Sequence, residues 1–146
     1  MTKTIGSERK VIVVTGATGG VGRGIALACA EAGWSVWIAA RREKEGEAVA
    51  AEVDALGGEG HFVACDVGVP GSAAEAIATI LSQEGRLDGV VHNATSGLSP
   101  VPVSLAEVGL ADFQDHVHVA LGALHSLARA SFEALKESQG SLLLMT

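Results

Sequence analysis

The sequence predicts an α/β protein built on an incomplete doubly wound parallel sheet of about five strands and four helices. Short apolar runs bounded by Gly, Asp, Asn or Pro alternate along the chain with longer segments of helical spacing. Apolar runs without polar alternation are typical of parallel strands buried on both faces. Strict alternation of strand and helix then favours the doubly wound arrangement.

The expected strands are short apolar runs that end at turn residues. In chain order they are Lys10–Val14, Ser35–Ala39, His61–Cys65, Leu87–His92 and Ser141–Met145. Because the runs are short and segments of helical spacing lie between them, we interpret all of them as strands of one sheet.

Four helices are expected between these strands. They are the segment with Val21, Ile25 and Cys29 that ends before Gly33, then Glu43–Leu56, Ser72 to about Gln83, and about Asp112 to Ser138. Ser72 and Glu75 have the spacing of a capping box, in which each side chain bonds the backbone amide of the other residue. Gly140 is expected to end the last helix.

Length and composition predict a single domain over residues 1–146. The hydrophobic fraction of 48% is enough for a buried core. The net charge of −7 argues against nucleic acid, because a phosphate-binding face needs clustered Lys and Arg. No apolar run approaches the ~20 residues that span a bilayer, and the N-terminus lacks a signal-peptide pattern, so no membrane partner and a cytoplasmic location are expected.

The cysteines, histidines and serines give no independent indication of a site. Cys29 and Cys65 stand alone in apolar stretches and are expected to pack as reduced side chains. The five histidines show no zinc-ligand spacing, so no metal is expected. Ser99 and Ser104 have no assignable His/Asp partner, which leaves a hydrolase without support.

The most informative segment is residues 11–26, VIVVTGATGGVGRGIA, a strand that leads through a glycine-rich turn into a helix. Free amides and the positive dipole end at a helix N-terminus favour an anion. Glycines allow the tight turn, the approach of a pyrophosphate and close packing of helix on strand. The expected cofactor-binding residues of this loop are Gly16, Thr18, Gly19, Gly20, Val21 and Gly22. The alternative is a tight turn without a ligand.

With Thr15 in front, the segment TGATGGVG resembles the TGxxxGxG motif of the short-chain dehydrogenase/reductase family. The resemblance continues after the third expected strand. There Asp66 and Val67 are similar to the family's Asp-Val pair, whose Asp meets the adenine amino group of the cofactor. The resemblance therefore implies that both residues contact a dinucleotide.

After the fourth expected strand, Asn93 and Ala94 match part of the family's N-N-A-G segment. His92 and Thr95 replace the first Asn and the Gly of that segment. In all, the resemblance covers residues 10–146 in the right order. It implies a Rossmann-like, dinucleotide-binding fold with Asn93 and Ala94 at the cofactor.

The end of the second expected strand favours NADP(H) over NAD(H). In dinucleotide folds an acid at this point accepts from the ribose 2′-OH of NAD, whereas arginine suits the 2′-phosphate of NADP. Residues 39–43 read AARRE, and Arg41 stands where NADP-preferring family members carry arginine. Arg41 is the expected main phosphate ligand and Arg42 a secondary one. The alternative is a solvated arginine pair, in which Glu43 or Glu45 pairs with either side chain.

No catalytic residue is expected within the chain. The resemblance places Ala120 where the family carries a catalytic Asn, and the sequence contains no tyrosine to supply the family's Tyr-x-x-x-Lys pair. His116 and His118 fit a polar helix face better than a catalytic replacement. The family's catalytic Ser would follow Thr146. The chain thus resembles the N-terminal, NADP(H)-binding part of a longer single-domain reductase.

Two functions fit the sequence. One is an NADP(H)-dependent oxidoreductase that transfers hydride to or from a carbonyl or secondary alcohol; the resemblance implies a small substrate of that kind and a homo-oligomer when complete. The alternative is a non-catalytic dinucleotide-binding or interaction module. The loop 94–110 is expected either to contact substrate or to be a variable surface connection. The last strand is expected to leave an apolar sheet edge exposed.

Overall fold

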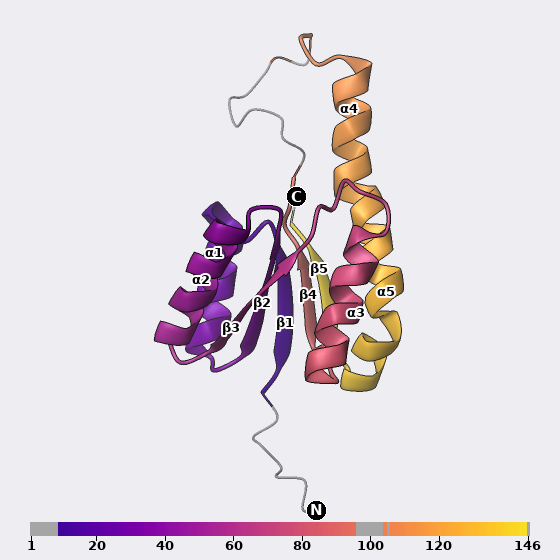
Figure 1. Ribbon diagram of the computed structural model, residues 1–146. Helices are drawn as coiled ribbons and strands as arrows, with labels where there is room; N and C mark the ends of the chain where they lie inside the picture. The colour runs from indigo at the N-terminus through magenta and orange to yellow at the C-terminus, as the bar shows by residue number, and fades with distance from the viewer. Residues whose placement is uncertain (1–8, 96–103, 105, 146) are drawn as a thin grey trace, which may run out of the picture.

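The computed structural model describes residues 9–95, 104 and 106–145 (Figure 1). Its elements in chain order are β1 (Val11–Thr15), α1 (Gly20–Glu31), β2 (Ser35–Ala40), α2 (Glu43–Ala55), β3 (Glu59–Ala64), α3 (Ser72–Glu84), β4 (Gly89–His92), α4 (Leu110–Val117), the π-helical turn η1 (His118–Gly122), α5 (Ala123–Ser138) and β5 (Ser141–Leu144). Because α4, η1 and α5 follow one another without a break, the helices form four segments, as the sequence predicts.

The sheet order is β3-β2-β1-β4-β5, and every adjacent pair is parallel. Helices α1 and α2 cover one face, and α3 and α5 cover the other (Figure 1). The predicted doubly wound α/β class is therefore confirmed. The strand limits agree with the predicted ones or differ by at most two residues, because hydrogen bonds to neighbouring strands decide where pairing stops.

Each strand of the sheet centre sends alternate side chains to opposite faces. On β1, Val11 and Val13 pack in the core beneath α3 and α5, whereas Ile12 and Val14 pack beneath α1 and α2. All four side chains are buried. Because helices cover both faces of the sheet, side chains on both faces are buried, and these strands are therefore continuously apolar in the sequence.

The capping box predicted at Ser72 and Glu75 is wrong. Helix α3 begins at Ser72 without a side-chain cap, after Gly71 in the left-handed conformation. The Ser72 hydroxyl instead accepts a hydrogen bond of 3.0 Å from the amide of Asp66. A donor from the preceding loop thus replaces the local helical amide, and Ser72 holds the loop that carries Asp66.

The last helix also ends differently from the prediction. Gln139, and not Gly140, adopts the left-handed conformation that closes α5, with φ of 55°. A Cβ on Gly140 would collide with the carbonyl of Asp88. Gly140 is therefore needed for close approach between chain segments, which a local sequence pattern does not show.

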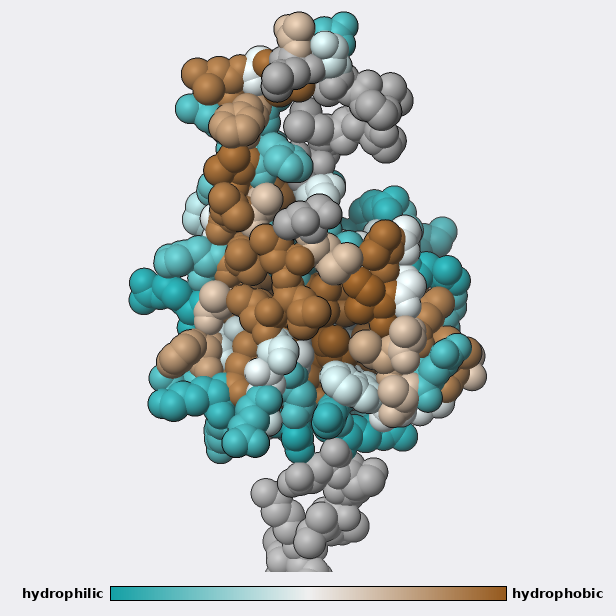
Figure 2. Space-filling model, turned by 180° about the vertical axis from the view of Figure 1, so that it is seen from behind, coloured by the Kyte–Doolittle hydropathy of each residue, from teal (hydrophilic) through white to brown (hydrophobic). Residues whose placement is uncertain are grey.

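Strand β5 lies at one edge of the described sheet and exposes apolar side chains. Leu143 is 49% exposed and Met145, directly after the strand, 39% exposed. Figure 2 shows apolar surface gathered in the middle of the rear face of the molecule. The predicted apolar edge is confirmed. None of the helices in the described part of the chain has both the length and the apolar character to cross a membrane.

Asp88, the residue before β4, is hydrogen-bonded to the start of β1. Its carboxylate accepts hydrogen bonds from the Val11 amide at 2.8 Å and from the Arg86 guanidinium at 2.6 and 2.9 Å. Burial by itself raises the pKa of Asp88, but the Arg86 and Val11 hydrogen bonds and the charges of Arg86 and Lys10 outweigh it. The pKa of Asp88 therefore lies below its ordinary value.

Asp88→Asn is expected to lower the free energy of unfolding by about 1–3 kcal/mol at neutral pH, because charge-assisted hydrogen bonds are lost. Since the folded-state pKa is lowered, this stabilisation is present above the unfolded pKa of about 4 and is lost as the pH falls through the folded-state pKa. Urea unfolding of both proteins between neutral and acid pH measures the effect. A difference between them that does not shrink in acid would contradict this role of the carboxylate.

Candidate functional site

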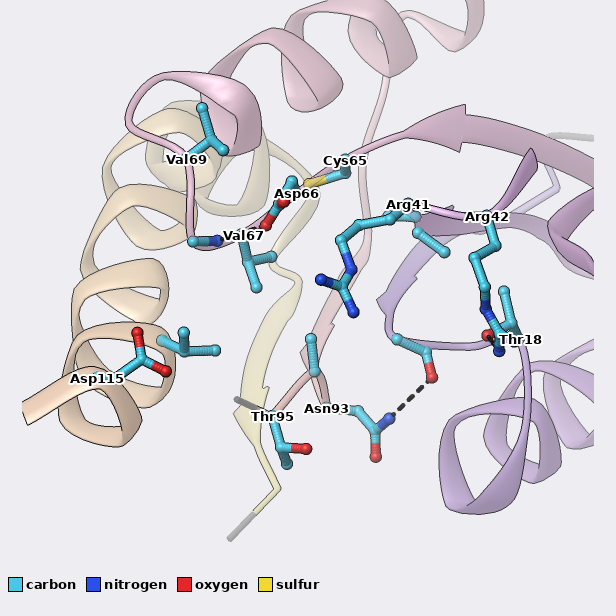
Figure 3. Close-up of a pocket in the computed structure, with 16 residues that line it drawn as sticks. Thr18, Arg41, Arg42, Cys65, Asp66, Val67, Val69, Asn93, Thr95 and Asp115 are labelled. Carbon is cyan, nitrogen blue, oxygen red and sulfur yellow. Dashed lines mark hydrogen bonds between the residues drawn. The ribbon is translucent and has the colours of Figure 1, made fainter. Parts of the chain in front are cut away.

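A cavity of about 490 Å³ opens at the carboxyl ends of the strands. This is the edge where the strand order reverses direction between β1 and β4, the usual ligand position in open α/β sheets. The lining residues come from five segments: Gly16 and Thr18 after β1, Ala39–Arg42 at the end of β2, Cys65–Val69 after β3, Asn93–Thr95 after β4, and Asp115 and Val119 on α4 and η1. Figure 3 shows these side chains around the cavity.

The glycines of the loop between β1 and α1 fall into two groups, according to whether a side chain at that position would meet other protein atoms. A Cβ on Gly16 would lie 2.9 Å from the Ala94 Cα, and one on Gly22 would lie 2.5 Å from the Asn93 side-chain nitrogen. These two glycines let the loop and the helix pack against the segment after β4. By contrast, a Cβ on Gly19 or Gly20 would meet no atom within 4 Å.

The open glycines lie where α1 begins, at the positive end of the helix dipole. Gly20 has a φ of +54°, a conformation that side chains rarely adopt. Val21 follows with 62% of its surface exposed. Gly19, Gly20, Val21 and Gly22 do not line the cavity itself; they form the first turn of α1 and its cap.

The two arginines after β2 have different surroundings. Arg42 donates a hydrogen bond of 2.9 Å to the Thr18 hydroxyl and lies 3.3 Å from a carboxylate oxygen of Glu45. The guanidinium of Arg41 points into the cavity and makes no ion pair or hydrogen bond with any residue that the structure describes (Figure 3). The Glu45 pairing proposed from the sequence therefore occurs at Arg42. Arg41 carries its positive charge into the cavity.

The segment after β3 is held in place by hydrogen bonds at both ends of Asp66. Its amide donates to the Ser72 hydroxyl, and its carboxylate accepts from the amide of Gly68 at 3.0 Å. Burial raises the pKa of the adjacent Cys65 thiol; a hydrogen bond with Ser72 opposes this in part, and the negative charge of Asp66 adds a smaller increase. Cys65 is therefore a neutral thiol in the cavity wall and not a thiolate nucleophile.

The segment after β4 is attached to the end of β1. The amides of Asn93 and Ala94 donate to the Thr15 hydroxyl at 3.0 and 3.1 Å. The Asn93 side chain donates to the carbonyl of Gly16 at 3.2 Å (Figure 3). Together these bonds hold the end of β1 and Gly16 against the segment after β4.

Of the residues expected at the cofactor, eight line this cavity: Gly16, Thr18, Arg41, Arg42, Asp66, Val67, Asn93 and Ala94. The sequence did not indicate Asp115 and Val119, because the placement of α4 and η1 against the sheet depends on packing between distant segments. It also did not indicate that the Thr15 hydroxyl bonds the ring of His92 at 3.0 Å, because the sequence shows only that each residue ends an apolar strand and not that the two strands are neighbours.

Other candidates from the sequence lie elsewhere. Ser99 and most of the loop 94–110 fall outside the described residues. Ala120, where the family resemblance expects a catalytic Asn, lies half-buried in η1. In the described part of the chain, no three His, Cys, Asp or Glu side chains are grouped in a way that could hold a metal ion.

This fold, with a cavity at the carboxyl ends of its strands, defines a doubly wound α/β protein of the Rossmann-like class. The sequence model of the short chain dehydrogenase family matches residues 10–146. The chain therefore belongs to the short-chain dehydrogenase/reductase family, whose members are oxidoreductases that bind a nicotinamide dinucleotide.

Known proteins that the chain resembles include enzymes and cofactor complexes. It is 30% identical over 135 residues to a 3beta-hydroxysteroid dehydrogenase of Mediterraneibacter gnavus, covering 92% of this chain and 48% of that protein. An alcohol dehydrogenase of the archaeon Thermococcus sibiricus, solved with 5-hydroxy-NADP, is 30% identical with a TM-score of 0.81, covering 92% of this chain and 56% of that one. A metagenomic short-chain oxidoreductase, solved with NADP, is 33% identical with a TM-score of 0.79, covering 91% and 60% respectively. The chain spans about half the length of the curated relatives it matches.

Proposed function

We propose that this chain is the NADP(H)-binding part of an oxidoreductase that transfers hydride between the cofactor and a carbonyl or secondary alcohol. The observation that carries the choice of NADP(H) is the Arg41 guanidinium, which points into the cavity without a protein partner among the described residues. A planar, permanently charged guanidinium suits a phosphate dianion. At the end of β2 no acid precedes Glu43, so no carboxylate stands at the position that accepts from a ribose 2′-OH.

The residues around the cavity fit an extended dinucleotide. The open space at Gly19 and Gly20 admits a pyrophosphate close to the backbone at the start of α1. The adenine would lie between the β2 and β3 ends, where Asp66 can accept from its amino group and Val67 provides an apolar contact. The 2′-phosphate would bind the Arg41 guanidinium, and Arg42 would be a secondary ligand.

When bound, NADP(H) supplies the hydride chemistry, and the chain supplies binding and orientation. Two of the solved structures that resemble this chain contain NADP or a derivative of it, which supports the same choice here. The substrate we propose is a small carbonyl compound or alcohol, handled by a homo-oligomer of the complete protein.

A second candidate is a non-catalytic dinucleotide-binding module. Ala120 favours it, because a methyl group can neither donate nor accept a hydrogen bond at the position where the family has its catalytic Asn. Both candidates require the same cofactor cavity. They differ in whether bound NADPH is oxidised.

Arg41→Ala is expected to weaken NADPH binding by about 1.5–3 kcal/mol, roughly tenfold to a hundredfold, because charge-assisted phosphate contacts are lost. NADH binding should change little, since NADH has no 2′-phosphate. Titration of nucleotide fluorescence with each cofactor measures both effects.

Arg42→Ala is the matched control, since Arg42 already donates to Thr18 and pairs with Glu45. Its loss of NADPH affinity should be clearly smaller than that of Arg41→Ala. Equal losses of NADPH and NADH affinity in the Arg41 variant would refute the proposed phosphate contact.

A further inference from the structure

His92 lies at the end of β4, and its side chain is fully buried. One ring nitrogen, Nδ1, is 3.0 Å from the Thr15 hydroxyl at the end of β1. The other, Nε2, is 3.1 Å from the backbone carbonyl of Val119 in η1. The ring therefore connects the end of β1, just before the glycine loop, with the turn η1.

The donors and acceptors around His92 are compatible with one arrangement of the hydrogens on its ring and on the Thr15 hydroxyl. The Val119 carbonyl can only accept, so Nε2 of His92 must carry a hydrogen. The Thr15 oxygen already accepts from the amides of Asn93 and Ala94, which occupies both of its lone pairs. Its own hydrogen must then point to Nδ1, and the imidazole is neutral with its proton on Nε2.

The π-helical turn explains why the Val119 carbonyl receives a side-chain donor. In an α-helix, the amide of Ala123 would donate to the carbonyl four residues earlier, at Val119. Here that amide donates to His118, five residues earlier. The turn diverts the α-helical donor of Val119, and the His92 ring donates in its place. π-Helical turns inside helices are frequent at functional sites.

We propose that His92 is a positioning residue that holds the π-helical turn η1, and with it the Val119 wall of the cavity, at a fixed distance from the glycine loop. Val119 lines the cavity, and its carbonyl accepts a hydrogen bond from the ring. Ala120, at the family's catalytic position, is the next residue of the same turn. The effect on nucleotide binding rests on the proposed NADP(H) function; the effect on η1 does not.

Two substitutions separate the two ends of the ring. In His92→Asn the amide overlies the Nδ1 end, so it can accept from Thr15 but falls short of Val119. In His92→Gln the amide reaches the Nε2 end and can still donate to Val119. His125→Asn is the matched control, because His125 is exposed on α5 away from the network.

The experiment is NMR of the 146-residue chain with NADPH titration of each variant. The wild-type imidazole should show the Nε2–H tautomer in long-range nitrogen–proton spectra. His92→Asn should shift the amide signals of residues 118–123 and weaken NADPH binding by about threefold to tenfold, the range for one lost hydrogen bond. His92→Gln should restore both toward wild type, and the His125 variant should change neither.

An Nδ1–H tautomer in the wild type, or η1 amide signals unchanged in His92→Asn, would overturn the proposal. If His92→Asn does not fold, His92→Gln decides, because displaced η1 signals in that variant contradict the role of the Nε2 donor. If the wild type binds neither NADPH nor NADH, the proposed function fails, whereas the tautomer and the η1 signals still test His92.

Discussion

Gly20→Val is expected to abolish NADPH binding while leaving most of the helix content intact. A Cβ at this position meets no atom within 4 Å, so the substitution causes no clash at the Cβ itself. Its side chain would instead occupy the open space at the start of α1, where the proposed pyrophosphate needs close contact with backbone amides. Circular dichroism and fluorescence titration with NADPH measure the two effects.

The variant also carries backbone strain, because Gly20 has a φ of +54°. Strain of this kind costs on the order of 1–3 kcal/mol. Gly33→Val is the matched control: Gly33 has a φ of +78°, no atom lies near its Cβ, and it follows the far end of α1. Both variants should lose similar stability, and only Gly20→Val should lose the cofactor. Normal NADPH binding by Gly20→Val would show that the loop is a turn without a ligand.

The 146-residue chain is expected to bind NADPH but to oxidise it with aldehydes, ketones or quinones at least about a hundredfold more slowly than a reductase of the family. General acid–base catalysis by a matched group supplies about 10²–10⁴-fold. The family uses a tyrosine for this step, the chain contains none, and Ala120 offers no hydrogen bond. NADPH consumption, followed by absorbance, can be compared with that of the Thermococcus sibiricus alcohol dehydrogenase on its own substrate.

Gly20→Val, purified in the same way, distinguishes the activity of the chain from contaminating host reductases. Turnover comparable to the reference enzyme that disappears in Gly20→Val would contradict the prediction and indicate another proton donor. His116 and His118 would then be the first residues to test. His92 is a weaker candidate, because both of its ring nitrogens are occupied by hydrogen bonds within the protein.

Local patterns were sufficient where the deciding interaction lies within a few residues. The glycine-rich turn between β1 and α1 could be predicted because strand, loop and helix start follow one another in sequence. The buried strands could be predicted because both of their faces are apolar. At Ser72 the same reasoning failed, since the amide of Asp66 competes with the local capping partner.

The sequence by itself determined the fold class, the position of the glycine loop and the arginine pair after β2, because each depends on residue type and short-range spacing. Only the tertiary structure decided which arginine faces the cavity, where η1 lies and how His92 connects it to Thr15. These features arise from contacts between segments more than twenty residues apart. Their geometry depends on how the helices pack on the sheet, and that packing cannot be predicted from the amino-acid pattern of any one segment.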